Sequence, residues 1–227
     1  MAVDAVIFDW GGTLTPWHSI NVEQLWSTAC EPHFPIAEVA ERAAALHAAE
    51  QELWLTGRAS HRSATMGQLF ELAGVIATEA LLASYRRVWE PHTFTDPDAI
   101  VLLGYLRERG IRIGVLSNTM WPRDWHDEVF RRDGVLHLID GSVYTSEIDW
   151  VKPHPGAFGA AMAALGVTDP GRCVFVGDRP YDDVHGAQSV GMRAVLVPNS
   201  DVPAYADAVP DAIIGSLAEL RPLIESW

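Results

Sequence analysis

Residues 3–13 read Val3-Asp4-Ala5-Val6-Ile7-Phe8-Asp9-Trp10-Gly11-Gly12-Thr13, a nearly continuous apolar run that leads into a polar turn with two glycines. An apolar run of this length is typical of a strand that is buried on both faces of a parallel sheet. Open sheets of this kind bind ligands outside the carboxyl ends of their strands. Asp9 stands at such an end, so this stretch predicts both the class of fold and the position of a site.

From Pro91 onward, segments typical of strands alternate with amphipathic helical segments. The expected strands cover residues 111–116, 143–145, 172–176, 194–197 and 212–214, and the expected helices cover residues 99–109, 125–131, 155–165, 182–190 and 217–224. This alternation, together with the first strand, predicts an α/β fold with a Rossmann-like, doubly wound parallel sheet.

The segment between the first strand and Pro91 has helical periodicity and no strand signal. We expect one helix over about residues 38–55, ended by Thr56-Gly57, and two more over about residues 63–73 and 78–89. The sequence therefore predicts a core domain of residues 1–16 and 91–227, with an inserted α-helical domain of residues 17–90.

The composition is that of a globular, strongly acidic protein. The chain has 227 residues, 48% of them hydrophobic, and a formal net charge of −14. A field of that sign disfavours nucleic acid and anionic membranes as partners, and no apolar run approaches the ~18 residues that a membrane span needs. Cys30 and Cys173 lie far apart without metal-ligand spacing, and residues 1–4 do not resemble a signal peptide, so we expect a reduced, cytoplasmic protein. No sequence feature indicates an oligomeric state.

Polar residues stand next to several of the expected strands, where they can converge on one pocket. Ser117 and Asn118 follow the strand over residues 111–116, and Asp178 follows the strand over residues 172–176. Lys152, the only lysine of the chain, lies in the loop before the helix over residues 155–165.

These residue types suit one reaction, the attack of a carboxylate on a phosphoryl group. Asp9 can form an aspartyl-phosphate and so divide the reaction into two steps. Because both reactants are anionic, we expect Mg²⁺ held by Asp9 and Asp178 and the point charge of Lys152 to compensate them. Ser117 and the N–H groups of the turn over residues 10–13 can bind phosphoryl oxygens.

The same residues also have ordinary structural interpretations. Ser117 and Asn118 are a common pair at a helix N-cap, and a single lysine usually lies at the surface. Asp178, however, is followed by Asp182 and Asp183. Such a cluster of carboxylates after a buried strand is costly unless a cation is present, which favours the functional interpretation.

Four segments of the chain resemble, in order and spacing, the four motifs of the haloacid dehalogenase-like (HAD) hydrolase superfamily. They are Phe8-Asp9-Trp10-Gly11-Gly12-Thr13-Leu14, Leu116-Ser117-Asn118, Val151-Lys152-Pro153-His154-Pro155 and Val176-Gly177-Asp178-Arg179-Pro180-Tyr181-Asp182-Asp183-Val184-His185-Gly186-Ala187. The resemblance covers nearly the whole chain, and the inserted helical domain resembles the α-helical C1 cap of that superfamily.

The resemblance implies a metal site. Asp9 would be the nucleophile and a ligand of Mg²⁺, together with the backbone carbonyl of Gly11 and with Asp178. Asp183, or Asp182 in its place, would orient water at the metal.

The resemblance also implies a site for a small phosphorylated metabolite. Ser117 and Lys152 would hold the phosphate and the carboxylate of the nucleophile. We expect further substrate contacts from a group of residues in the turn, after the second strand and in a loop of the helical domain: Trp10, Gly12, Asn118 and Arg58.

Gly11 is the one important departure from the family pattern. Phosphatases of the superfamily usually carry a second aspartate there, which protonates the leaving group and then activates water. Positioned acid–base groups typically contribute ~10²–10⁴-fold in rate. The substrate therefore has a good leaving group, or another residue such as His18 or His61 substitutes, or the activity is low.

Two other functions stay open beside a phosphatase, and a third branch of the superfamily is effectively excluded. The 2-haloacid dehalogenases form an ester at the same aspartate without a metal, but they usually have a tyrosine at the position of Gly11. A phosphonoacetaldehyde hydrolase needs a Schiff-base lysine in the cap, and this branch is effectively excluded because the chain has no lysine besides Lys152. A catalytically weak or inactive protein that binds a phosphate or metabolite is the second function that stays open.

Overall fold

The computed structural model describes residues 3–200 and 202–227, so the first two residues of the expected core segment 1–16 lie outside the described part. Its centre is a six-stranded sheet in the order β3-β2-β1-β4-β5-β6, in which every neighbouring pair is parallel. The strands are β1 (Ala5–Phe8), β2 (Arg112–Ser117), β3 (Gly141–Tyr144), β4 (Cys173–Gly177), β5 (Arg193–Leu196) and β6 (Ala212–Ile213). The predicted Rossmann-like α/β fold is confirmed.

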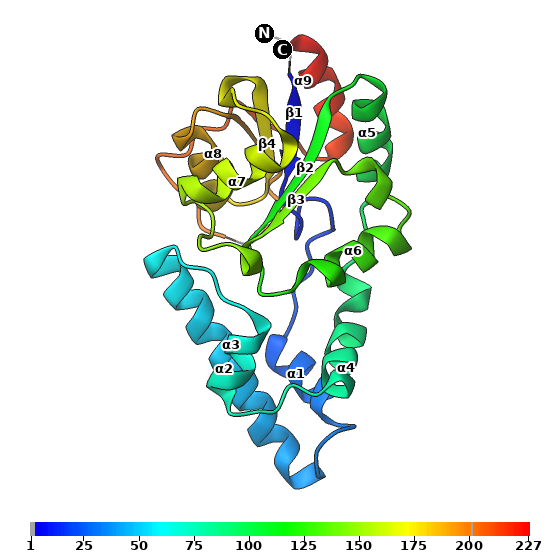
Figure 1. Cartoon of the computed structure of the whole chain (residues 1–227), viewed down its shortest axis with the longest axis vertical. Coiled ribbons are helices and arrows are strands. Elements are labelled where there is room, and N and C mark those ends of the chain that lie inside the picture. Colours follow the sequence, from blue (N-terminus) through cyan, green and yellow to red (C-terminus); the bar gives the residue numbers. More distant parts are fainter. Residues whose placement is uncertain (1–2, 201) are drawn as a thin grey trace.

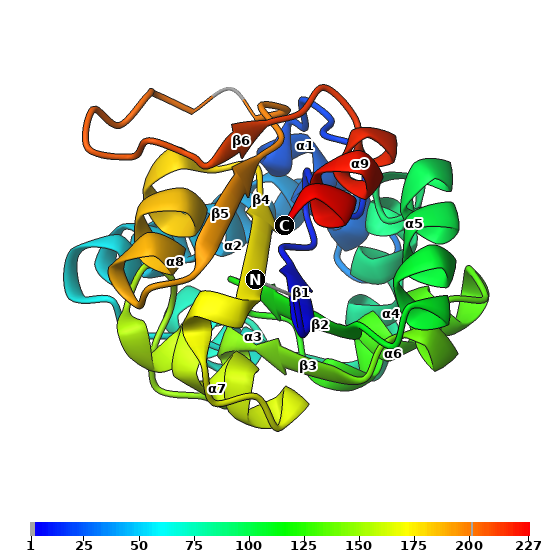
Figure 2. The ribbon, with the colours of Figure 1, turned by 90° about the horizontal axis from the view of Figure 1, so that it is seen from above.

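Helices cover both faces of this sheet, as Figure 2 shows, with α7 and α8 on one side and α5 and α9 on the other. The helices that follow β1 and lie below the sheet in Figure 1 are α1 (Val22–Cys30), α2 (Ile36–Ser60), α3 (Met66–Ala73) and α4 (Glu79–Trp89). Those of the sheet region are α5 (Pro97–Glu108), α6 (Arg123–Arg132), α7 (Pro155–Leu165), α8 (Gly186–Ser189) and α9 (Leu220–Ser226). Short 3₁₀ turns are η1 (Glu90–His92), η2 (Leu136–Leu138), η3 (Thr145–Glu147), η4 (Pro170–Arg172) and η6 (Leu217–Glu219), and η5 (Pro180–His185) is a π-helical turn.

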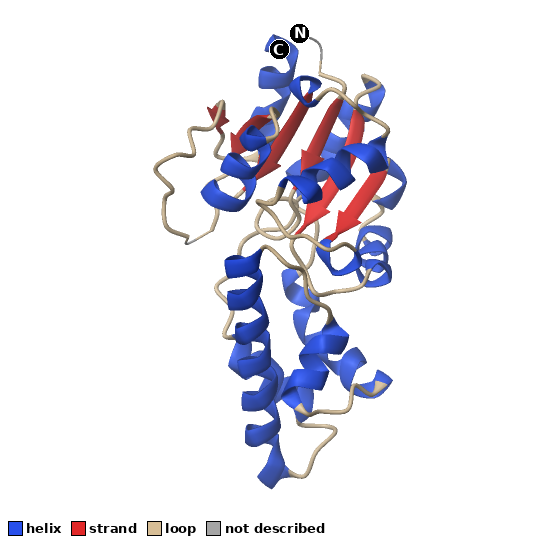
Figure 3. Cartoon of the chain, turned by 60° about the vertical axis from the view of Figure 1, so that its left-hand side comes forward, coloured by secondary structure: helices blue, strands red, loops and turns tan. Residues whose placement is uncertain are grey.

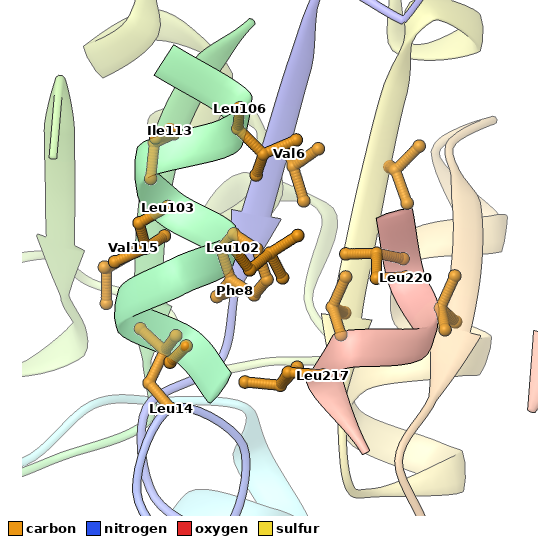
Figure 4. Close-up of a cluster of buried hydrophobic side chains, with 14 of the residues drawn as sticks. Val6, Phe8, Leu14, Leu102, Leu103, Leu106, Ile113, Val115, Leu217 and Leu220 are labelled. Carbon is orange, nitrogen blue, oxygen red and sulfur yellow. The ribbon is translucent and has the colours of Figure 1, made fainter. Parts of the chain in front are cut away.

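The central strand β1 is buried on both faces because its side chains alternate between two cores. Val6 and Phe8 pack with Leu102, Leu103 and other residues of α5 and α9, as Figure 4 shows. Ala5 and Ile7 instead pack with residues of α7 and α8, among them Phe158 and Ala187. The continuous apolar run of the sequence therefore corresponds to a strand with no solvent-exposed side.

Helices α1 to α4 form a helical lobe that packs around its own apolar core. Trp26 of α1, Leu46 of α2, Leu69 of α3 and Leu81 of α4 are all fully or nearly fully buried in it. Met120 and Trp121, from the loop after β2, and Trp125 of α6 belong to the same cluster, so the lobe and the sheet region share an apolar contact. Within the described residues, no helix combines the length and the apolar content of a membrane span.

The predicted end of the long helix at Thr56-Gly57 is wrong, because α2 continues to Ser60. Gly57 is a packing position within the helix, since a Cβ there would lie only 3.1 Å from the carbonyl oxygen of Arg62. The helix ends instead at His61, whose φ of 55° is left-handed. Arg58, expected in a loop, consequently lies in the last turn of α2.

Candidate active site

The carboxyl ends of three neighbouring strands bring the predicted residues together, at the edge of the sheet that faces the helical lobe (Figure 3). Asp9 directly follows β1, and its backbone N–H donates to the carbonyl of Val176 at 2.9 Å. Ser117 is the last residue of β2, and Asp178 directly follows β4. All three side chains are nearly fully buried, so β1 and its two neighbours present a compact polar floor.

Lys152 joins two of the carboxylates through its ammonium group. Its Nζ lies 2.5 Å from Oδ1 of Asp9 and 2.7 Å from Oδ1 of Asp183. Burial alone would lower the pKa of Lys152, but the charges of Asp183 and Asp9 outweigh it and raise the pKa above its usual range. The only lysine of the chain is therefore a buried cation that is held by two acids.

Asn118 holds the backbone of Lys152 in place. The Lys152 N–H donates to Oδ1 of Asn118 at 2.8 Å, and Nδ2 of Asn118 donates to the Lys152 carbonyl at 3.1 Å. Both polar atoms of the Asn118 side chain are thus engaged in fixing the loop before α7. The expected contact between Asn118 and a substrate stays a prediction.

Asp178 is an unsatisfied acid in the middle of the floor. Neither of its carboxylate oxygens accepts a hydrogen bond within the described part of the chain, and Ser200 donates to its backbone carbonyl instead. Burial, followed by the charges of Asp9 and Asp183, raises the pKa of Asp178 to about 8. One ligand oxygen from each of Asp9, Asp178 and Asp183 lies within 4.8 Å of the others. A divalent cation with a preference for oxygen ligands, such as Mg²⁺, fits these residues.

Asp183 and Asp182 have different surroundings although they are adjacent. Asp183 is fully buried, and its Oδ2 accepts a hydrogen bond from the backbone N–H of Arg179 at 2.9 Å. Gly177 allows this approach, because a Cβ there would lie 2.3 Å from Oδ2 of Asp183. Asp182 does not belong to the carboxylate cluster, lines the cavity and lies 3.6 Å from the guanidinium of Arg179.

The two glycines of the first turn serve different purposes. Gly12 has a left-handed φ of +83°, and a Cβ there would lie 2.7 Å from Oδ2 of Asp178, so no larger residue fits. A Cβ at Gly11 would meet no atom within 4 Å. Sequence reasoning missed Asn199, whose Nδ2 donates to the Gly12 carbonyl at 3.0 Å. Its position shortly after β5 was the available signal, because polar residues gather at the carboxyl ends of strands.

A cavity of about 660 Å³ lies between the polar floor and the helical lobe. The predicted residues Trp10, Gly12 and Arg58 line it together with Asp9 and Lys152. Ser117, Asn118 and Gly11 also contribute to its walls, and Asp178 and Asp183 lie behind them. The sequence-predicted residues therefore meet at one place.

The two histidines that were considered as acid–base substitutes lie in different places. His18 lines the cavity, and its Nδ1 lies 2.8 Å from Nδ1 of His92, which also lines it. His61 does not line this cavity and instead has its ring beside that of His154. The structure thus keeps His18 and disfavours His61 as a group that can reach a substrate.

His126 supports the wall behind the nucleophile, and sequence reasoning did not find it. Its ring stacks on Tyr144 with a centroid distance of 4.2 Å and meets the edge of Trp10 at 4.5 Å. Burial, assisted by the charge of Arg123, lowers the pKa of His126 to about 3. The imidazole is therefore neutral and acts as an aromatic packing residue under Trp10.

A Rossmann-like sheet with buried carboxylates and a buried lysine at its carboxyl edge defines the class of protein, a hydrolase built on an α/β core. The chain matches the haloacid dehalogenase-like hydrolase family over residues 3–191, and it belongs to that family.

Several curated relatives are phosphatases. The chain is 34% identical over 124 residues to the phosphoserine phosphatase of Thermus thermophilus, covering 55% of this chain and 49% of the relative. It is 34% identical over 132 residues to the glyceraldehyde 3-phosphate phosphatase of Methanopyrus kandleri, covering 56% and 55%. The chain thus spans about half the length of these relatives.

Solved structures match the fold over almost the whole chain. A HAD phosphatase from Thermococcus onnurineus has a TM-score of 0.69 at 27% identity, covering 98% of both chains. The L-2-haloacid dehalogenase from Xanthobacter autotrophicus has a TM-score of 0.67 at 20% identity, also covering 98% of both chains. The second likeness is one of fold alone.

Proposed function

We propose that the protein is a Mg²⁺-dependent phosphatase that hydrolyses a small phosphorylated metabolite through an aspartyl-phosphate on Asp9. The observation that carries the proposal is the arrangement of Asp9 and Asp183 around the ammonium group of Lys152, beside the carboxylate of Asp178, which has no hydrogen-bond partner among the described residues. The phosphatases among the curated relatives support the same reaction class.

Asp9 is suited to act as the nucleophile. Lys152 binds its Oδ1, which leaves Oδ2 for attack on phosphorus. The new bond joins Oδ2 to phosphorus while the bond between phosphorus and the ester oxygen breaks, and the leaving oxygen departs as an anion or takes a proton from solvent or from His18. Water then attacks the phosphorus of the acyl phosphate, which releases inorganic phosphate and restores the carboxylate.

Different residues around Asp9 would bind the phosphoryl oxygens and the metal ion. Ser117 and the N–H groups of the turn after Asp9 would bind the phosphoryl oxygens, and Lys152 would keep its charge beside them. Asp9, the carbonyl of Gly11 and Asp178 would hold Mg²⁺, which neutralises charge on the phosphoryl group when it is bound. We assign the outer carboxylate of the metal site to Asp183 rather than Asp182, because only Asp183 lies within the acidic cluster.

Proton transfer to the leaving group is the weak part of this site. Gly11 has no side chain, so the alcohol leaves most readily when it is already a good leaving group or when His18 protonates it across the cavity. We further propose that residues 17–90 act as the cap domain that closes over the floor. The free, buried thiols of Cys30 and Cys173 support a reducing cytoplasmic location.

The substitution Asp9→Asn tests the proposal with p-nitrophenyl phosphate, whose leaving group hardly needs an acid. Because an amide is a far weaker nucleophile than a carboxylate, we expect the rate with Mg²⁺ to fall at least about 10³-fold. Asp207→Asn, which removes an exposed carboxylate far along the chain, is the matched control and should keep its activity. Undiminished turnover by Asp9→Asn would falsify the mechanism.

A further inference from the structure

The long helix α2 lays one face along the cavity. Glu50, Gln51, Trp54, Leu55 and Arg58 line it, at the spacing that places residues on one side of a helix. Arg58 lies near the polar floor, since it shares a wall with Lys152 and Asp182. Glu50 precedes Arg58 by eight residues, which is about 12 Å along the helix axis. The cavity therefore extends well beyond the phosphate site, toward the interior of the lobe.

The walls between these two ends are mostly aromatic. The cavity is lined by Trp10, Trp17, Trp54, Trp89, Trp121 and Tyr85. Aromatic faces bind organic cations through the ring quadrupole, and the attraction strengthens when water is excluded. They also bind apolar groups, so the aromatic walls alone leave the charge of the ligand undecided.

Glu50 decides between these two kinds of ligand. Its Oε2 accepts a hydrogen bond from Nε1 of Trp26 at 2.7 Å, and burial raises its pKa. The pKa of Tyr85 is raised mainly by burial and secondly by the charge of Glu50. The two side chains are therefore near each other inside the lobe. Within the described residues, Glu50 forms no ion pair with a lysine or arginine.

Glu50 is only partly exposed, and an apolar ligand would bury its carboxylate further without bringing a positive charge, which is costly. A ligand that brings its own positive charge would compensate it. The other acids that line the cavity, Asp9 and Asp182, already have Lys152 and Arg179 beside them. The lysine and arginines of the cavity thus lie at the phosphate end, and Glu50, which has no lysine or arginine partner among the described residues, lies at the lobe end.

We propose that the physiological substrate is a phosphate monoester whose leaving group ends in an organic ammonium, bound between the aromatic walls and Glu50. This inference rests on the proposed phosphatase function. It requires a substrate long enough to join the two ends, since the phosphate lies at Asp9 and the ammonium lies at Glu50.

Pairs of esters that differ only in charge test the proposal. In 6-aminohexyl phosphate the phosphorus and the nitrogen are about 10 Å apart when the chain is extended, at roughly 1.2 Å per bond, and heptyl phosphate is its uncharged isostere. We expect the wild-type protein with Mg²⁺ to prefer the amine by at least about tenfold in kcat/KM. The short pair of 2-aminoethyl phosphate and propyl phosphate should show no such preference, because its ammonium does not reach Glu50.

Two variants connect the preference with Glu50. In Glu50→Gln, which keeps the shape but removes the charge, the ratio of kcat/KM between the long amine and heptyl phosphate should fall to about one. Glu52→Gln removes the same charge from an exposed position of α2 two residues away, and it should keep the wild-type ratio. Because each ratio compares two esters on one protein, partial loss of folded protein in a variant does not affect it.

The possible results distinguish a wrong ammonium site from a wrong phosphatase function. If heptyl phosphate is the better substrate of the wild-type protein, or if Glu50→Gln keeps the preference for the amine, the ammonium site is wrong and the phosphatase stands. If no ester, including p-nitrophenyl phosphate, is turned over in a manner that depends on Asp9, the phosphatase itself is wrong.

Discussion

The two ends of the cavity are built in opposite ways. At the sheet end, Asp9, Lys152 and Asp183 are buried ions that hold one another at 2.5 and 2.7 Å. At the lobe end, Glu50 is a single acid among aromatic rings. In the proposed phosphatase, fixed charge at the strand ends would serve a reaction that is the same for every phosphate ester, and the aromatic walls formed by the helices would bind the part of a substrate that varies. We therefore expect changes at the sheet end to affect the reaction of all esters and changes at the lobe end to affect the choice among them.

Removal of Mg²⁺ is expected to have the largest effect, and it acts on the sheet end only. Without a cation, the charge of the phosphoryl group opposes attack by the Asp9 carboxylate, so turnover of p-nitrophenyl phosphate should fall by about 10³-fold. Steady-state rates in EDTA, and again after excess MgCl₂ is added, measure the loss and its recovery. Turnover of 2-chloropropionate that survives chelation would instead indicate the metal-independent chemistry of a haloacid dehalogenase.

Gly11→Asp is expected to raise the phosphatase activity, because it adds an acid at the sheet end. Because a Cβ at this position meets open space, the new carboxyl group can protonate the leaving alcohol, and kcat/KM for an alkyl phosphate should rise by about 10²-fold. The gain with p-nitrophenyl phosphate should be much smaller, since that leaving group hardly needs an acid.

Gly12→Asp is the matched control for that gain. The left-handed φ of Gly12 and the 2.7 Å approach of Asp178 leave no room for a side chain, so this variant should lose activity. Equal gains on both esters in Gly11→Asp would show that the added group does not act as an acid.

Asp178→Asn should make the metal-free fold more stable and weaken the binding of Mg²⁺. The pKa of Asp178 is raised to about 8, so the carboxyl stabilises the metal-free fold at low pH and this contribution is lost as the pH rises from about 4 to about 8. In EDTA at pH 8 the variant should therefore gain roughly 1–3 kcal/mol in free energy of unfolding, with little gain at pH 4. Urea unfolding measures this. A variant that Mg²⁺ stabilises as much as it does the wild type would exclude Asp178 as a ligand.

His126→Phe tests the packing of the buried imidazole between the two ends of the cavity. We expect it to have the smallest effect of these changes. The folded-state pKa of His126 is lowered to about 3, so its neutral ring supports stability above pH 6.5, and this support is lost as the pH falls below that. The wild type should lose up to about 1.4 kcal/mol per pH unit from this residue, and the variant should not. Urea unfolding at pH 7, 6 and 5 measures the slope, with the exposed His137→Gln as control. Equal slopes in wild type and His126→Phe would contradict the buried neutral ring.

The sheet end could be predicted from the sequence because its information is local. Asp9, Ser117 and Asp178 each stand at the end of an apolar run, and the topology of a parallel sheet brings such ends together without knowledge of any other contact. Lys152 was found because it is the only lysine. Its partners, Asp9 and Asp183, lie 143 and 31 residues away from it, yet both belong to the same predicted edge.

The lobe end could not be predicted, because the roles of its residues depend on contacts with helices that are distant in the sequence. Gly57 reads as a helix end, but its close approach to Arg62 makes it an interior position, and this error placed Arg58 in a loop. Glu50 looks like any acid of an amphipathic helix until α1 and α4 enclose it with Trp26 and Tyr85. His126 has no motif around it, and only its contact with Trp10 relates it to the site.

The tryptophans that line the cavity have a practical consequence, because their fluorescence should respond to what the cavity contains. Trp10, Trp17, Trp54, Trp89 and Trp121 line its walls, and indole emission changes with polarity and with nearby charge. A ligand that displaces water from this space would alter the intrinsic fluorescence of the protein directly. Entry and departure of unlabelled compounds can therefore be followed in stopped flow, on the time scale of a single turnover and without any reporter group.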